Sequence, residues 1–247
     1  PYTVGTWGSR GATLGGGAVH KAAGILREKL LRIAAQHLQM PAEALELAAG
    51  CARVMGDPGR AISIRELARW AQRNVDQLPE GMEPGLTAAS FVDGPPDGAY
   101  SNAVHSAVVE IDPATGEMKL RRFLVVEDCG TIINPMIVDG QVRGGVVQGI
   151  GSAICEHFVY SEDGQPLTAN FGDYLMPSAP EIPPIEVHHF VTPSPLTPLG
   201  MKGLGEGGAI GPAAAIANAV SNALGVPVLE TPITKHRVWQ LAQGKRK

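Results

Sequence analysis

One acidic residue of the sequence stands in a setting that could support proton transfer. Glu206 is surrounded by five glycines, at positions 200, 203, 205, 207 and 208. A lone carboxylate in such a loop would be solvated if the loop only connects two elements. If the loop is buried against a cofactor, burial raises the carboxylate's affinity for a proton toward the range that suits a general base. Lys202 is close in sequence and would oppose that change if it were also near in space.

The glycine run also matches a nucleotide-binding pattern, which its context argues against. Residues 203–208 read G-x-G-x-x-G, but a dinucleotide fingerprint requires a strand directly before it. The preceding segment 192–198 contains three prolines, and prolines at that density preclude a buried parallel strand. The proline-rich lead therefore argues against a Rossmann-type site.

Three further segments combine small residues with a few polar groups: residues 5–17, 128–141 and 170–177. Glycine allows backbone N–H groups to converge on an anion, and a glycine-rich loop ahead of a helix makes an anion site at the helix N-terminus. Segment 5–17 has this form. The alternative, a plain tight loop, stays open on this pattern alone.

The metal-binding side chains do not form a recognisable site. Cys51, Cys129 and Cys155 are too widely spaced to hold an iron–sulfur cluster alone, and each is expected to be a small buried residue. His188 and His189 would point to opposite faces of a strand and cannot chelate together. The sequence has neither an H-E-x-x-H motif nor a G-x-S-x-G nucleophile elbow.

Composition excludes other classes of partner. The formal net charge of −4 argues against a nucleic-acid groove or binding to an anionic membrane surface. No apolar run is long enough to predict a membrane span. The odd cysteine count fits a reducing compartment better than a disulfide framework. Cytoplasm is the default location, and folded export beside a partner stays open.

Local patterns place these segments between helices and strands. Apolar periodicity predicts a helix over 18–39, ended by Pro41, and Ser63 with Glu66 forms a capping box for a second helix that runs to about residue 75. Five glycines between 140 and 151 in the helix predicted over 135–155 indicate close approach of another backbone or a ligand. The other elements expected are a helical turn at 42–47, strands at 52–55, 87–92, 103–112, 118–127 and 186–191, and helices at 209–224 and from Thr231-Pro232 to about 243. Because helix and strand do not alternate regularly, the order favours an α+β fold.

Taken in order, four segments resemble one family closely. They are GTWGSRGATLGGGAV (5–19), EDCGTIINPMIVDGQVRGGVVQGIGSAICE (127–156), NFGDYLMPSAPEIPPIEV (170–187) and GMKGLGEGGAIGPAAAIANAVSNAL (200–224). They are similar to the C-terminal motifs of the molybdenum-binding large subunit of the xanthine dehydrogenase/aldehyde oxidase family. The nearest branch is that of the bacterial hydroxylases that use molybdopterin cytosine dinucleotide, similar to aerobic carbon monoxide dehydrogenase.

The resemblance implies a fold and an activity. It implies a C-terminal molybdenum cofactor-binding region over 1–247, with mixed sheets, packed helices and long ordered cofactor loops, divided into subdomains 1–100 and 101–247. The implied reaction is hydroxylation of an aldehyde or an N-heteroaromatic carbon with water as the oxygen source. Glu206 stands at the position of the family's active-site base. The dithiolene of the pterin would hold molybdenum, so no protein side chain is expected as a metal ligand.

The resemblance also implies cofactor contacts. The loop Gly8-Ser9-Arg10 would bind phosphate or pterin, where an arginine can fork onto phosphate oxygens. The expected cradle for the pterin nucleotide consists of Asp128, Cys129, Gly130, Asn134 and Gln141. Asn134 precedes Pro135 and has an equally weighted role as a helix cap. Gly205 and Gly207 would let the backbone approach the metal.

The implied partners lie outside the sequence. The family's large subunit is much longer, so its N-terminal part would be a separate chain or fragment. The 2Fe-2S cluster and FAD would belong to partner subunits that carry electrons away, and the substrate would be a small molecule. Two alternatives stay open: a carbon monoxide dehydrogenase-type subunit, and a scaffold homologue that has lost catalysis.

Overall fold

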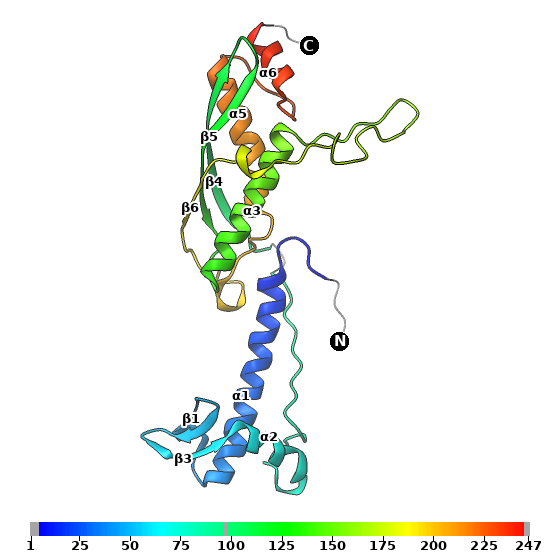
Figure 1. The fold of residues 1–247 in the computed structure, drawn as a ribbon. Coiled ribbons are helices and arrows are strands. Elements are labelled where there is room, and N and C mark those ends of the chain that lie inside the picture. The colour runs from blue at the N-terminus through cyan, green and yellow to red at the C-terminus, as the bar shows by residue number, and fades with distance from the viewer. Residues whose placement is uncertain (1–4, 96–97, 245–247) are drawn as a thin grey trace. The chain divides into compact units, whose positions relative to one another are not determined.

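The structure is a computed structural model that describes residues 5–95 and 98–244. The chain forms two compact units, one of Leu14–Asp93 and the other of Pro1–Thr13 with Gly94–Lys247 (Figure 1). Both units mix helices with antiparallel strand pairs, which confirms the predicted α+β class. None of the helices in the described ranges is long and apolar enough to cross a membrane.

The unit Leu14–Asp93 is built on one long helix and a small sheet. Helix α1 (Gly17–Leu38) ends where Gln39 takes a left-handed conformation. Strands β1 (Leu45–Ala48), β2 (Cys51–Val54) and β3 (Asp57–Ser63) form an antiparallel sheet, and α2 (Ile64–Arg73) follows directly. Ile33 and Leu67 are fully buried in the core that these elements share. The predicted capping box is present, since Ser63 accepts a hydrogen bond from the Glu66 backbone and the Glu66 side chain bonds back.

The second unit is a three-stranded sheet packed against helices. Strands β4 (Asn102–Asp112) and β5 (Glu117–Asp128) form the predicted antiparallel hairpin, and β6 (Ile185–His189) pairs with β5 in parallel. Helices α3 (Pro135–Ile154) and α5 (Pro212–Leu224) pack on the sheet, and α6 (Lys235–Ala242) joins the same core. The buried residues of this core are Phe123, Val125, Val142, Val146, Ile150, Ala153, Ile185, Ile216, Val220, Ile233 and Val238.

The glycines of α3 allow a second backbone to lie against the helix, as the sequence predicted. A Cβ on Gly145 would lie 3.0 Å from the Gly208 Cα, and a Cβ on Gly149 would lie 2.7 Å from the Ala209 carbonyl oxygen. Gly208 and Ala209 belong to the short helix α4 (Gly207–Ile210). The close packing of α4 on α3 therefore sets the position of the segment that follows Glu206.

Several predicted boundaries are wrong. Residues 87–92 form no strand, and the turn predicted over 42–47 is a 3-10 turn at Ala42–Ala44 followed by β1. The single helix predicted over 209–224 is interrupted before Pro212, because proline has no N–H to continue the hydrogen bonding of α4. The last helix begins at Lys235 and not at Pro232, since the Thr234 side chain caps it by accepting a hydrogen bond from Arg237. The remaining 3-10 turns are Val75–Gln77, Ala179–Glu181 and Pro198–Gly200, and a π-helical turn covers Gly11–Gly16.

Candidate functional site

The loop that carries Glu206 is fastened to the loop of residues 5–10 by a pair of hydrogen bonds. The Ser9 hydroxyl donates to Glu206 Oε2 at 2.6 Å, and the Glu206 backbone N–H donates to Ser9 Oγ at 3.0 Å. Glu206 is otherwise exposed and stands directly before α4. The structure thus brings together two residues that the sequence assigned separately, one as a base and one as a cofactor contact.

Glycines on both sides of Glu206 make this packing possible. A Cβ on Gly203 would lie 2.9 Å from the Ser9 Cβ, and one on Gly205 would lie 3.4 Å from Ser9 Oγ. On the other side, a Cβ on Gly208 would lie 2.5 Å from the Val142 carbonyl oxygen of α3. Real Cβ atoms do not approach other heavy atoms this closely, so Gly203 and Gly208 cannot carry a side chain without displacing their neighbours.

A second loop runs beside the segment before Glu206. The Lys202 N–H donates to the Cys129 carbonyl at 2.8 Å, and the Thr131 N–H donates to the Gly200 carbonyl at 3.0 Å. Gly130 has a φ of +70°, and a Cβ there would lie 2.3 Å from the Gly200 oxygen, so only glycine fits. This pairing places Lys202 beside the end of β5.

Asp128 is held in its charged form. Its side chain accepts hydrogen bonds from the Gly130 N–H at 2.8 Å, the Thr192 N–H at 3.2 Å and Lys202 Nζ at 3.2 Å. Burial favours the neutral acid, but the hydrogen bonds from Thr192, Gly130 and Lys202 outweigh it and lower the pKa of Asp128 from 3.8 to about 2. The Asp128 and Lys202 side chains are only 13% and 11% exposed. From the sequence, the Lys202 ammonium could have acted on Glu206. In the structure it is paired with Asp128 instead.

Cys129 lies in the same loop but is not poised as a nucleophile. It is 4% exposed, and burial, with the nearby Glu127 carboxylate, raises the pKa of its thiol to about 11. A neutral thiol is a poor nucleophile and a poor metal ligand. The burial agrees with the expectation from the sequence that Cys129 is a small buried residue.

The two residues predicted on α3 have different surroundings. Gln141 Nε2 donates to the Gly205 carbonyl at 2.8 Å, which joins the helix to the residue before Glu206. The Asn134 side chain accepts a hydrogen bond from the Ile137 N–H at 3.4 Å, so the structure displays its capping role.

Arg10 is folded back on its own loop. Its guanidinium donates to the Gly5 carbonyl, with a shortest distance of 2.7 Å, and lies 4.1 Å from the centre of the Trp7 ring. Gly8 and Ser9 precede it with positive φ angles of 59° and 58°. The turn through Gly8 and Ser9 therefore sends Ser9 toward Glu206 while Arg10 remains beside Trp7.

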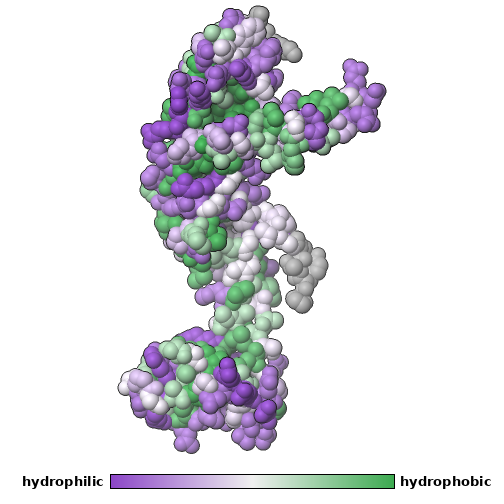
Figure 2. Space-filling model, in the orientation of Figure 1, coloured by the Kyte–Doolittle hydropathy of each residue, from purple (hydrophilic) through white to green (hydrophobic). Residues whose placement is uncertain are grey.

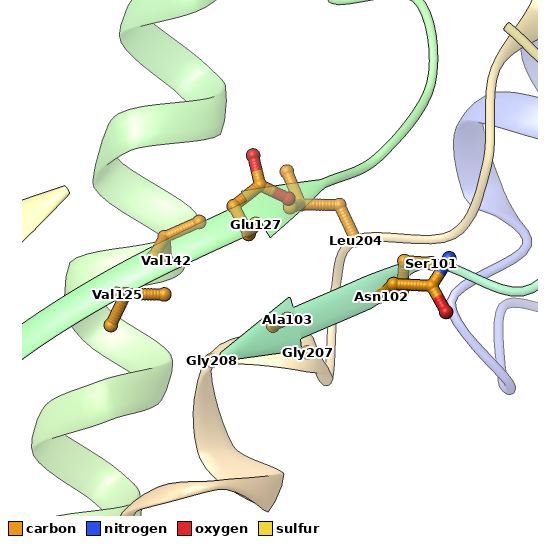
Figure 3. A pocket seen from close by; sticks show the side chains of 9 residues that line it. All are labelled: Ser101, Asn102, Ala103, Val125, Glu127, Val142, Leu204, Gly207 and Gly208. Carbon is orange, nitrogen blue, oxygen red and sulfur yellow. The ribbon is translucent and has the colours of Figure 1, made fainter. Parts of the chain in front are cut away.

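A small pocket opens between the Glu206 loop and the ends of two strands (Figure 3). It is lined by Ser101, Asn102, Ala103, Val125, Glu127, Val142, Leu204, Gly207 and Gly208. Of these residues, only Gly207 was expected from the sequence to belong to the site. Glu127 is 5% exposed and lies 2.6 Å from His189 Nδ1 on the adjacent strand β6. Glu127 and His189 are neighbours because they are register partners in the parallel pairing of β5 with β6. The sequence alone gives no signal for that register.

His105 is a further, half-buried residue that sequence reasoning missed. Burial lowers the pKa of His105, and a hydrogen bond with the Gly207 backbone only partly opposes this effect. A Cβ on Gly211 would lie 2.2 Å from the His105 ring, so the ring packs directly under the turn between α4 and α5. Its Nδ1 has no hydrogen-bond partner among the described residues.

The described residues contain no group of three or more His, Cys, Asp or Glu side chains that could hold a metal ion. The site instead offers closely packed glycine loops, exposed backbone and one exposed carboxylate. Such a site fits a group that brings its own metal ligands and is cradled by loops.

Comparisons with known proteins identify the family of the chain. The sequence profile of the molybdopterin cofactor-binding domain matches residues 1–183, and the chain belongs to this family. The resemblance seen in the four motifs is thereby confirmed.

The relatives are components of molybdenum hydroxylases. The chain is 42% identical to the nicotine 6-hydroxylase large subunit of Paenarthrobacter nicotinovorans, over 98% of this chain and 30% of that subunit. It is 38% identical to the carbon monoxide dehydrogenase large chain of Afipia carboxidovorans, over 98% of this chain and 30% of that chain.

A solved structure supports the fold. Quinoline 2-oxidoreductase from Pseudomonas putida 86 matches with a TM-score of 0.86 and 38% identity, over 98% of this chain and 31% of that chain. The chain thus spans about a third of the length of the relatives that it matches.

Proposed function

We propose that this chain is the C-terminal catalytic part of a molybdenum hydroxylase, in which Glu206 is the base that takes a proton during hydroxylation of an electron-poor carbon. The observation that carries the proposal is the Glu206 loop itself. An exposed carboxylate is held in place by the Ser9 hydroxyl, while Gln141 holds the carbonyl of the preceding residue. A positioned carboxylate that can lose and regain a proton is the requirement for a general base.

The cofactor proposed is molybdopterin cytosine dinucleotide with molybdenum, which would supply the redox chemistry and the activated oxygen source. The chain's own residues would bind and orient it. The backbone of Gly8, Ser9, Gly130, Gly205 and Gly207, with the side chains of Arg10, Asn134 and Gln141, would form the contacts. Asp128 and Cys129 would support the cradle from inside the loop, since both side chains are already packed in the protein.

The proposed partners are the N-terminal part of the molybdenum subunit, an iron–sulfur subunit and an FAD subunit. The relatives are named as subunits or chains of larger enzymes, and this chain spans about 30% of their length. An arm of residues 157–176 leaves the second unit between α3 and β6 (Figure 1) and gathers hydrophobic residues between hydrophilic ones (Figure 2). Its exposed apolar side chains are Phe158, Tyr160, Leu167, Phe171, Leu175 and Met176. A run of exposed apolar side chains is typical of an interaction surface, which supports a role within a larger assembly.

Substrate and location are proposed on narrower grounds. The named activities of the relatives favour nicotine, quinoline or another N-heteroaromatic compound, with an aldehyde as a further candidate and carbon monoxide as the alternative. The cytoplasmic location expected from the sequence remains a prediction. A scaffold that has lost catalysis is the other alternative, and the retained Glu206 argues against it.

The test is to purify the chain with its co-eluting partners and to measure molybdenum, iron, flavin and released nucleotide in one sample. Turnover of nicotine, quinoline, benzaldehyde, xanthine and carbon monoxide is then assayed with an artificial electron acceptor. We expect molybdenum and CMP in equal amounts, iron and FAD from the partners, and turnover of at least one substrate. An intact complex without molybdenum would identify a scaffold and reject the proposed function.

A further inference from the structure

Both hydrogen bonds of the Ser9 hydroxyl join it to Glu206. A hydroxyl has one O–H to donate, and Ser9 donates it to Glu206 Oε2 at 2.6 Å, the short distance of a bond to a charged acceptor. The same oxygen accepts the Glu206 N–H at 3.0 Å. Ser9 thus fixes both the carboxylate and the backbone of Glu206.

The surrounding backbone is shaped to bring this hydroxyl to the loop. Ser9 has a φ of 58°, a left-handed conformation that a serine adopts rarely and at a cost in energy. A Cβ on Gly203 would lie 2.9 Å from the Ser9 Cβ, closer than real Cβ atoms approach, so a side chain at position 203 would displace Ser9. The glycine at 203 and the left-handed conformation of Ser9 therefore both permit the contact between Ser9 and Glu206.

We propose that Ser9 is a positioning residue for Glu206: its hydroxyl holds the carboxylate in the single orientation from which it accepts the proton. This inference rests on the proposed function of Glu206 and goes beyond the assignment of Ser9 as a cofactor contact. The two roles predict different results when the Ser9 hydroxyl is removed. Loss of a cofactor contact would lower cofactor retention, whereas loss of a positioning residue would lower turnover, and only while Glu206 is present.

The experiment is a double-mutant cycle in the complete enzyme, assayed with whichever of the five substrates above is turned over fastest. Ser9→Gly removes the hydroxyl and also relieves the strain at φ 58°. Displacement of a reacting group from its productive geometry lowers the rate, so we expect kcat to fall about 10- to 100-fold, with KM and molybdenum content unchanged. Ser9→Ala should have the same effect, because it lacks the same hydroxyl. In the Glu206→Gln background, Ser9→Gly should cause little further loss, since the carboxylate that it positions is gone.

The other unit supplies a matched control. Ser63 Oγ donates to Glu66 Oε2 at 2.6 Å and accepts the Glu66 N–H at 3.2 Å, the same reciprocal pair at the start of α2. Ser63→Ala should lower the thermal midpoint and leave kcat unchanged. Additive losses of Ser9→Gly and Glu206→Gln, or loss of molybdenum from Ser9→Gly, would overturn the positioning role and leave Glu206 as the base. Full turnover by Glu206→Gln would instead reject the proposed function itself.

Discussion

Asp128, the last residue of β5, and Glu206, in the loop before α4, belong to the same unit, and the protein surrounds their carboxylates in opposite ways. Asp128 is largely buried and accepts hydrogen bonds from two backbone N–H groups and the Lys202 ammonium. Glu206 is exposed, and the Ser9 hydroxyl donates to its carboxylate. The first arrangement stabilises a charge within the fold, whereas the second orients a carboxylate and leaves it exposed to solvent.

The difference arises from what each loop packs against. The 128–131 segment pairs with 200–202 through backbone hydrogen bonds, which brings a cation to Asp128. The loop around Glu206 has glycines where its neighbours approach, so Ser9 and α3 come close without covering the carboxylate. Substitutions that exchange or remove these environments test whether the two acids have separate roles.

The largest expected effect is on turnover. Glu206→Gln keeps the size of the side chain and removes its ability to take a proton. General base catalysis contributes about 10²–10⁴-fold, so we expect turnover to fall by about 10³-fold. Molybdenum content and the thermal midpoint should not change, because the side chain is exposed. Steady-state kinetics, metal analysis and thermal unfolding of the same preparation measure these three quantities.

The control for this substitution is Glu83→Gln, which neutralises an exposed glutamate of the other unit. It should retain full activity. If Glu206→Gln keeps wild-type turnover, the assignment of the base is wrong and the contrast between the two carboxylates has no catalytic meaning.

The sequence could predict these loops only in part. Local signals located the hairpin, the start of α3 and the capping box, because turn residues and caps act over a few neighbouring positions. They also marked Glu206 by its glycines. Ser9 and Glu206 are 197 residues apart, and no local rule joins them. Lys202 shows in the same way that contacts between distant segments escape local rules. Its proximity in sequence suggested Glu206 as its neighbour, but backbone pairing with residues 129–131 brings its ammonium to Asp128.

The second prediction concerns the stability that Asp128 provides. Asp128→Asn leaves the Lys202 ammonium largely buried without its counter-charge, and breaking such a pair costs about 3 kcal/mol of the free energy of unfolding. The pKa of Asp128 in the folded protein is about 2, below its ordinary value of 3.8. A lowered pKa means that the stabilisation is present above about pH 4 and is lost as the pH falls toward 2.

Denaturant unfolding at pH 7 and thermal unfolding between pH 5 and pH 2.5 measure these two effects. The wild type should lose stability over the acidic range more steeply than Asp128→Asn does, because the variant has no proton to bind at that position. The control is Asp163→Asn in the exposed arm, which should behave as the wild type does. Equal stability of Asp128→Asn and wild type at pH 7 would mean that the Lys202 pair contributes nothing to the fold.

The smallest expected effect concerns α3, the helix against which the segment after Glu206 packs. A Cβ on Gly149 would lie 2.7 Å from both the Ala209 oxygen and the Pro212 Cγ, so Gly149→Ala should force α4 and α5 away from α3. Overpacking of this kind costs about 1–3 kcal/mol of the free energy of unfolding.

On the same helix, a Cβ on Gly144 meets nothing within 4 Å, and Gly144→Ala should stabilise the protein by about 1 kcal/mol through helix propensity. Thermal unfolding of the two variants should therefore shift in opposite directions. Turnover should fall in Gly149→Ala alone, since only that change moves the segment that follows Glu206. Equal shifts in both variants would mean that the glycines of α3 do not hold the Glu206 loop, and that Ser9 and Gln141 suffice to place it.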